Sequence, residues 1–210
     1  MEKINKLKKL FNKYDIDGYL IPKNDEFFGE YIPENKDRLR FISNFTGSYG
    51  FALILKDKNY LFVDGRYSIQ AKIQSGKLFN VFVLPDSSPS KILLKKSLKI
   101  GYDPKLYTHK MLDVFFGKTN SKLISIQKNL IDSLIKNKTE KSKKFFILPK
   151  KSIGEDYKFK INKLIDTMKK TKVNFQFITA TENVAWLLNI RGKDSNFTPI
   201  PNAFLTIDLE

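Results

Sequence analysis

Hydrophobic positions along this chain follow two spacings, one typical of strands and one typical of helices. The clearest strand signal is a hairpin, because the apolar runs 51–55 and 60–63 are joined by the polar turn Lys56–Asn59. Short apolar runs bounded by Gly, Pro or polar residues predict further strands at 18–22, 79–84, 99–103, 122–126, 174–178 and 204–208. Helical spacing predicts helices at 3–14, 66–74, 89–97, 108–117, 154–172 and 184–190. This alternation of strands and helices predicts an α/β fold with a mixed sheet flanked by helices.

Local signals refine the expected ends of these elements. Asn24 or Asp25 can cap a short helical turn through Tyr31, and Pro33 begins another that leads to the turn at Gly47. Residues that favour helix starts or stops also flank the longer helices: Gly76, Thr108, the capping-box pattern Thr179–Glu182, and Gly192.

Two glycine motifs could carry chemistry, but a structural interpretation is favoured for each. In Gly47-Ser-Tyr-Gly50 the serine directly follows a glycine and a strand comes next, which fits neither a nucleophile elbow nor an RNA-clamping loop. A turn that lets two backbones approach closely is favoured. In Asp64-Gly-Arg66, Asp64 is expected to cap a helix while Arg66 pairs with a nearby acid; substrate-carboxylate binding by Arg66 is the alternative.

The strand and helix pattern is interrupted once, by a polar and charged stretch. We predict a first domain at 1–136, a linker at 137–151, and a second α/β domain at 152–210. The second domain has only two predicted helices and two predicted strands, which would leave open sheet edges. We therefore expect it to be part of a larger, truncated domain.

Composition excludes several classes of site. The chain has no Cys and one His, so disulfides, thiol nucleophiles, Cys-ligated metals and two-His metal sites are excluded. His109 is expected at a helix start on the surface, and Glu26 and Glu30 are expected to be solvated. No apolar run approaches the roughly 20 residues needed to cross a bilayer, and no secretory signal pattern is present. We expect a soluble, cytoplasmic protein with no membrane partner.

The net charge of +16 raises the question of nucleic-acid binding. Only four of the 38 basic residues are Arg, the side chain that reads and stacks on bases, and the Lys residues are spread along the chain. Solvated Lys faces are favoured; nucleic-acid binding through the denser run Lys136–Lys151 remains a less favoured alternative.

Several long motifs, in chain order, resemble one family. Residues 25–31, 38–50 and 63–71 resemble the N-terminal domain of Xaa-Pro aminopeptidases (aminopeptidase P) of the three-domain form. Asn129-Leu-Ile-Asp132 is similar to the family's "NLVD" exit from its first domain, and residues 181–192 are similar to "DEIAWLLNLRG" in its second. The chain departs from the family pattern at Phe27-Phe28, Asn44 and Tyr49, where His-Gln, Gly and Ala are common.

The resemblance implies a creatinase-type N-terminal domain followed by the first half of a second domain. Full-length members remove the residue that precedes proline, using a C-terminal domain that holds two divalent metals, usually manganese, through two Asp, one His and two Glu. None of those ligand motifs is in this sequence, so we expect no catalytic residue, metal ligand or cofactor here. A creatinase-like amidinohydrolase parent is an alternative that the segment 186–192 disfavours.

The resemblance also implies a role at the rim of the substrate cleft and in subunit contacts. The candidate residues are Tyr31, Arg38, Arg40, Phe45, Asp64 and Arg66. The expected partners are a second copy of the chain or a separate catalytic domain, with short Xaa-Pro peptides bound only by the full-length enzyme. A stand-alone interaction module is the alternative function.

Overall fold

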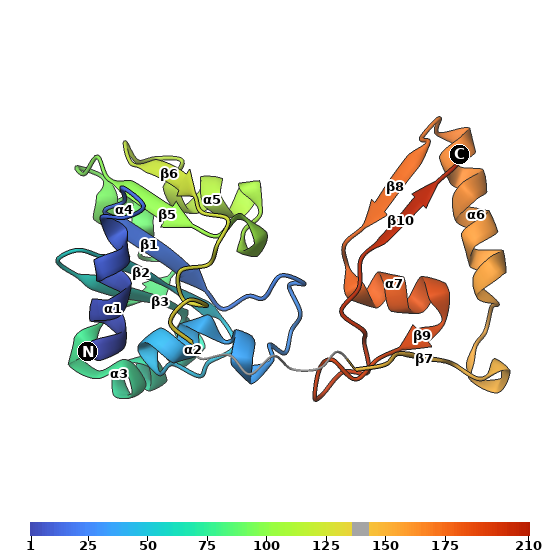
Figure 1. Cartoon of the computed structure of the whole chain (residues 1–210), viewed down its shortest axis with the longest axis horizontal. Helices are drawn as coiled ribbons and strands as arrows, with labels where there is room; N and C mark the ends of the chain where they lie inside the picture. The colour runs from blue at the N-terminus through green and yellow to red at the C-terminus, as the bar shows by residue number, and fades with distance from the viewer. Residues whose placement is uncertain (136–142) are drawn as a thin grey trace. The chain divides into compact units, whose positions relative to one another are not determined.

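The computed structural model describes residues 1–135 and 143–210. The chain forms two compact units (Figure 1). The first unit comprises Met1–Glu26 and Glu34–Lys138, and the second comprises Phe27–Pro33 and Thr139–Glu210.

The first unit is built on a six-stranded mixed sheet with the order β4-β3-β2-β1-β5-β6. β2 is antiparallel to both β1 and β3, whereas β4 is parallel to β3, β5 to β1 and β6 to β5. The register of the β2–β3 hairpin places Phe51 opposite Phe62, which confirms the predicted hairpin. The strands are β1 (Gly18–Pro22), β2 (Gly50–Leu55), β3 (Asn59–Asp64), β4 (Asn80–Leu84), β5 (Lys99–Tyr102) and β6 (Lys122–Ser125).

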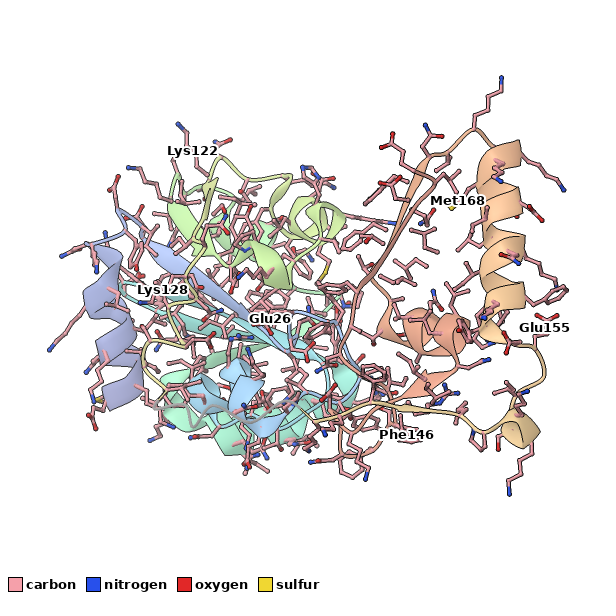
Figure 2. The ribbon with its side chains drawn as sticks, turned by 45° about the vertical axis from the view of Figure 1, so that its right-hand side comes forward. Glu26, Lys122, Lys128, Phe146, Glu155 and Met168 are labelled. Carbon is pink, nitrogen blue, oxygen red and sulfur yellow. The ribbon has the colours of Figure 1, made fainter. Side chains whose placement is uncertain are left out.

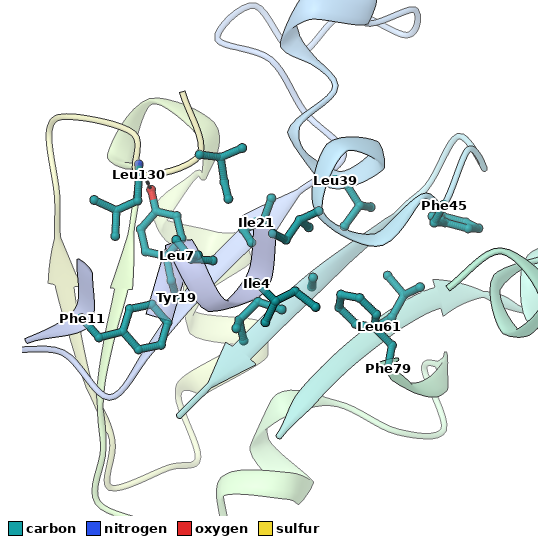
Figure 3. Close-up of a cluster of buried hydrophobic side chains, with 14 of the residues drawn as sticks. Ile4, Leu7, Phe11, Tyr19, Ile21, Leu39, Phe45, Leu61, Phe79 and Leu130 are labelled. Atoms are coloured by element: carbon teal, nitrogen blue, oxygen red, sulfur yellow. Dashed lines mark hydrogen bonds between the residues drawn. The ribbon is translucent and has the colours of Figure 1, made fainter. Parts of the chain in front are cut away.

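Helices cover both faces of this sheet. The side chains of α1 and α2 pack on one face in a core that includes Ile4, Leu7 and Leu39 (Figure 3). Side chains of α4 and α5, among them Leu93 and Phe115, pack on the other face. β1 and β2 are consequently buried at every position, as is typical of strands in the middle of a doubly covered sheet. The helices are α1 (Glu2–Phe11), α2 (Arg38–Ser43), α3 (Ser68–Ser75), α4 (Pro89–Leu93) and α5 (His109–Phe116).

The second unit contains two helices and two small antiparallel sheets. β8 pairs with β10, and β7 pairs with β9. The helix α6 runs alongside the β8–β10 pair, and α7 follows β8 (Figure 1). The elements are β7 (Phe146–Ile147), α6 (Tyr157–Lys170), β8 (Phe175–Ile178), α7 (Thr181–Leu188), β9 (Ile190–Arg191) and β10 (Leu205–Asp208).

Several predicted boundaries are confirmed. Thr108 Oγ1 accepts a bond from the Met111 amide at the start of α5, and Gly76 follows α3 with a φ of 57°, which favours glycine. Other boundaries are wrong. α4 ends at Leu93 rather than at 97, and α6 begins after its cap residue Asp156 rather than at Gly154.

Two local predictions are wrong because longer-range contacts decide the structure. No helix forms at 25–31; in that segment the Phe27 ring packs 4.9 Å from Phe204, and Phe28 has a φ of 54°. The predicted capping box is also absent. α7 begins after Ala180 without a side-chain cap, and Thr181 Oγ1 contacts Glu182 instead.

Within the predicted linker, Phe146–Ile147 forms β7 and pairs with β9. The linker residues 137–142 lie outside the described part of the chain. No helix among residues 1–135 and 143–210 has the length and hydropathy needed to cross a membrane.

Candidate functional site

A buried ion network joins three distant segments of the first unit. The Arg38 side chain, at the start of α2, is fully buried. Its Nη2 donates to Glu26 Oε1 at 2.6 Å and to Asp132 Oδ2 at 2.8 Å, and its Nε donates to Asp132 Oδ1 at 2.7 Å. Because the guanidinium binds Asp132 through two donors, the geometry of the pair is fixed.

Local capping bonds place two side chains of this network, those of Arg38 and Asp132. Asp37 caps α2 by accepting from the Arg40 amide at 3.1 Å, which fixes the first turn of that helix. Asn129 Oδ1 accepts from the amides of Ile131 and Asp132, at 2.9 and 3.3 Å, and so shapes the turn after β6. The Asn129 side chain is positioned in turn by a hydrogen bond that its Nδ2 donates to Asp103 Oδ2 at 2.8 Å.

The network sets the ionisation of its members. Burial alone would raise the pKa of Glu26, but the attraction of Arg38 and the bonds to the carboxylate outweigh it and keep that pKa below its ordinary value. Burial alone would lower the pKa of Arg38, yet its bonds to Asp132 and Glu26 outweigh that effect and raise it. The interpretation of Glu26 as a solvated carboxylate is therefore wrong.

The lowered pKa of Glu26 makes stability depend on pH. Because the folded-state pKa lies below the ordinary value of 4.5, the contribution of Glu26 is fully present above pH 4.5 and is lost as the pH falls through the folded-state value. We expect the free energy of unfolding to decrease on acidification below about pH 4.5. Urea titrations at several pH values should show a smaller acid dependence in Glu26→Gln; an unchanged acid limb would contradict this role.

Asp64 and Arg66 form a local exposed pair. Asp64 Oδ1 accepts from the Arg66 amide at 3.0 Å and from Arg66 Nε at 2.8 Å, which confirms the structural interpretation of this motif. Nearby, Ser48 and Tyr67 share a hydroxyl bond at 2.7 Å. On α2, Arg40 is exposed and its Nη1 donates to Glu34 at 2.9 Å.

The glycine turn places backbones close together, as predicted. Gly50 has a φ of 156°, and a Cβ there would lie 2.6 Å from the Phe62 carbonyl oxygen. Phe45 is fully buried and packs edge-on against Tyr67 at 5.7 Å between ring centroids. Arg38 and Phe45 are therefore core residues that hold α2 and this turn in place. Their role at a cleft rim or subunit contact stays a prediction, and any such role would be indirect.

The remaining candidate, Tyr31, lies in the second unit. Its ring is 5.0 Å from that of Phe197, and its side chain is partly exposed. Tyr31 lines a pocket of about 390 Å³ together with Glu30, Glu182 and Asn202. The pocket walls therefore offer carboxylate, amide and hydroxyl groups to a polar ligand.

A buried lysine was missed by the sequence reasoning. Lys160 on α6 is 5% exposed, and its Nζ donates to the Trp186 carbonyl and to Asn189 Oδ1 at the end of α7. The ammonium group also lies 4.3 Å from the centre of the Trp186 ring, and burial lowers the pKa of Lys160. A cation at a helix C-terminus is stabilising, so Lys160 ties α6 to α7. Nothing in the sequence distinguishes this lysine from the exposed ones around it.

The structure places His109 on the surface at the start of α5. Among residues 1–135 and 143–210, no three His, Cys, Asp or Glu side chains come together in a way that could hold a metal ion.

Two family models that carry the same description match successive parts of the chain. Residues 3–134 match a creatinase/prolidase N-terminal domain, and residues 136–210 match a second model of that description.

Curated relatives match the chain from end to end. The probable Xaa-Pro aminopeptidase P of Laccaria bicolor is 32% identical over 220 residues, covering 100% of this chain and 34% of the relative. Xaa-Pro aminopeptidase 1 of Dictyostelium discoideum is 28% identical over 229 residues, covering 100% of this chain and 36% of the relative. The chain thus spans about a third of the length of these relatives.

A solved structure also matches the whole chain. The X-prolyl aminopeptidase of Caenorhabditis elegans, described as a cytosolic enzyme with a di-nuclear active site, has a TM-score of 0.90 and 26% identity, covering 100% of this chain and 37% of that one. The predicted mixed α/β fold of creatinase N-terminal type is thereby confirmed. The chain belongs to the creatinase/prolidase N-terminal domain family, and the relatives that match it along its whole length include Xaa-Pro aminopeptidases.

Proposed function

We propose that this chain is the non-catalytic N-terminal portion of an Xaa-Pro aminopeptidase, and that it shapes the substrate cleft and the subunit contacts of that enzyme. The observation that carries the proposal is the end-to-end match with enzymes about three times its length. In this proposal the exposed candidates Tyr31, Arg40 and Arg66 lie at the surfaces offered to other parts of the enzyme.

The chemistry would belong to the part of the enzyme that this chain does not match. We place there two divalent metals, with manganese as the expected ion, in keeping with the di-nuclear active site of the Caenorhabditis elegans relative. Metal-bound hydroxide at such a pair can attack a peptide carbonyl. Short peptides with proline in second place are the proposed substrates. The cytoplasm is the proposed compartment, because that relative is described as cytosolic.

The test is reconstitution of activity from two separate polypeptides. We expect the purified chain with Mn²⁺ to release no arginine from Arg-Pro-Pro. Adding the portion of the Caenorhabditis elegans enzyme that this chain does not match should restore release, because the cleft would then be complete. Chromatographic detection of free arginine measures turnover, and Arg-Ala-Pro serves as the control peptide. Turnover by the chain alone would refute the proposal. So would a rate of arginine release by the Caenorhabditis elegans portion that is the same with and without the chain.

A further inference from the structure

A pocket of about 320 Å³ lies within the second unit. Its walls come from the loop before α6, from α6 itself, from the end of α7 and from β9. None of the six candidate residues of the cleft rim and subunit contacts lines it. We call it the lysine–tryptophan pocket, and its lining includes Leu148, Ile153, Glu155, Lys160, Trp186 and Arg191.

Hydrogen bonds hold the walls of this pocket together. Asn189 ends α7 in the left-handed conformation, and its Nδ2 donates to the Glu155 carbonyl at 2.9 Å. The Asn189 carbonyl accepts from the Leu148 amide at 2.9 Å, and its Oδ1 accepts from Lys160 Nζ at 2.6 Å. Glu155, labelled in Figure 2, directly precedes Asp156, the cap residue of α6. The loop before α6 is thus tied to the end of α7, as in the preformed pockets that bind small ligands.

The lining of the pocket carries more positive than negative charge. It includes two cations, Lys160 and Arg191, and one acid, Glu155. Glu155 Oε1 already accepts from Lys163 Nζ at 2.8 Å. Burial lowers the pKa of Lys160; the charge of Glu155 opposes this shift without cancelling it, and the charge of Arg191 adds to it. An anion in the pocket would therefore be attracted by both cations.

Arg191 has donors left for such an anion. Its Nη1 donates to the carbonyls of Ile190 and Ala185, at 2.8 and 3.3 Å. Its Nε and Nη2 form no hydrogen bond with residues 1–135 or 143–210. These two atoms are the parallel donors along one edge of the guanidinium, and such an edge binds a carboxylate through two bonds.

The remaining walls are apolar. Leu148 and Ile153 line the pocket, and the Trp186 side chain beside them is 61% exposed. The Lys160 ammonium lies 4.3 Å from the centre of the Trp186 ring, so the indole and the two cations belong to one site. An aromatic or aliphatic group can pack against an indole that is exposed in this way.

We propose that the lysine–tryptophan pocket binds a small carboxylate that carries an apolar group. The carboxylate accepts two bonds from Arg191, Lys160 adds its attraction, and Trp186 covers the apolar group. Inorganic phosphate fits less well, because it offers nothing apolar to the indole. Both a free acid and the C-terminal end of a peptide have the required chemistry. The inference does not rest on the proposed function, since it assigns no role in peptide cleavage to the pocket.

The fluorescence of Trp186 provides the first test, because it is the single tryptophan of the chain and lines the pocket. The probe is 3-phenylpropionate, which should change the emission saturably with a dissociation constant of about 1 mM. The uncharged 3-phenylpropionamide should bind about tenfold more weakly, because it cannot pair with the guanidinium as an anion. Equal binding of acid and amide, or no saturable change with the acid, would overturn the inference.

Two further probes define the ligand. Binding of inorganic phosphate as tight as that of 3-phenylpropionate would overturn the role of the apolar walls. N-acetyl-phenylalanine presents the same carboxylate and ring as a peptide end does. If it binds more tightly than 3-phenylpropionate, the peptide end is the better ligand; if it binds more weakly, the free acid is. Either order supports the inference, provided that 3-phenylpropionate binds and its amide does not compete.

Calorimetry with variants provides the second test. Arg191→Lys keeps the charge but replaces the two parallel donors by a point charge, so it should weaken binding of 3-phenylpropionate about tenfold. Lys193→Ala removes an exposed cation that does not line the pocket, and it should bind within about twofold of the unaltered chain. Equal binding by these two variants would overturn the role of Arg191. Far-UV circular dichroism of each variant checks that the fold persists.

Trp186 provides a variant that does not depend on the Arg191 side chain. Because its indole is 61% exposed, Trp186→Ala should leave the fold in place while weakening binding of 3-phenylpropionate about tenfold. Phe159→Ala is the matched control, since Phe159 is 52% exposed on α6 and does not line the pocket. Equal affinities of these two variants would place the acid elsewhere on the chain and overturn the inference.

Discussion

Replacing Arg38 by alanine is expected to lower the free energy of unfolding of the first unit by about 3 kcal/mol, because it leaves the Asp132 carboxylate without its cation and Glu26 with only the partly exposed Lys36 at 3.2 Å. Removing one partner of a buried pair typically costs about 3–5 kcal/mol. The lower end applies here, since the side chains of Glu26 and Asp132 are 23% and 31% exposed and keep some contact with water. The network joins α2 to the segments after β1 and β6, so its loss should loosen all three segments. Figure 2 labels Glu26, which lies in the segment after β1.

The single tryptophan allows the two units to be followed separately during urea unfolding. Trp186 lies in the second unit, so its fluorescence reports that unit, whereas far-UV circular dichroism reports both. Arg38→Ala should shift the circular dichroism transition and leave the fluorescence transition in place. A coincident shift of both transitions would contradict a role confined to the first unit.

Matched variants separate the ion network from the helix that carries it. Arg40 lies on α2 as well, but its side chain is 48% exposed, so Arg40→Ala should change stability by less than roughly 0.5 kcal/mol. The triple change Arg38→Met, Glu26→Gln and Asp132→Asn should cost less than Arg38→Ala alone, because no inward-facing carboxylate is left without its cation and Lys36, which loses Glu26, is partly exposed. If the triple variant is less stable than Arg38→Ala, the loss of stability in Arg38→Ala does not come from unpaired carboxylates.

Replacing Gly50 by alanine is the second large effect that we expect, a loss of about 2–4 kcal/mol from backbone strain and steric overlap together. The φ of 156° is one that side chains of L-residues rarely adopt, and the added Cβ would lie 2.6 Å from the Phe62 carbonyl oxygen. This oxygen belongs to the β3 backbone, which cannot move aside without disturbing the hairpin. The change should therefore also speed hydrogen exchange along β2 and β3.

Gly65 offers the matched control for this substitution. It lies in the same unit, directly after β3, and a Cβ there would lie 3.8 Å from Val83 Cγ1, an ordinary contact distance. Gly65→Ala should leave the circular dichroism transition within roughly 0.5 kcal/mol of the unaltered chain. Equal losses for the two variants would show that the close approach at Gly50 is not the cause.

The sequence by itself determined the features that depend on neighbours a few residues apart. The β2–β3 hairpin, the Asp64 cap and the close approach at Gly50 follow from strand alternation, from a polar turn and from glycine placement. The motif order was also sufficient to place the chain among relatives of the Xaa-Pro aminopeptidases.

Only the tertiary structure decided which distant groups meet. Arg38 lies 12 residues from Glu26 and 94 from Asp132, and no local spacing encodes either pair. The 25–31 segment forms no helix, because aromatic contacts at Phe27 and Tyr31 outweigh the weak local preference for a turn of helix. Packing energy depends on proximity in space, and for these features the fold alone creates that proximity.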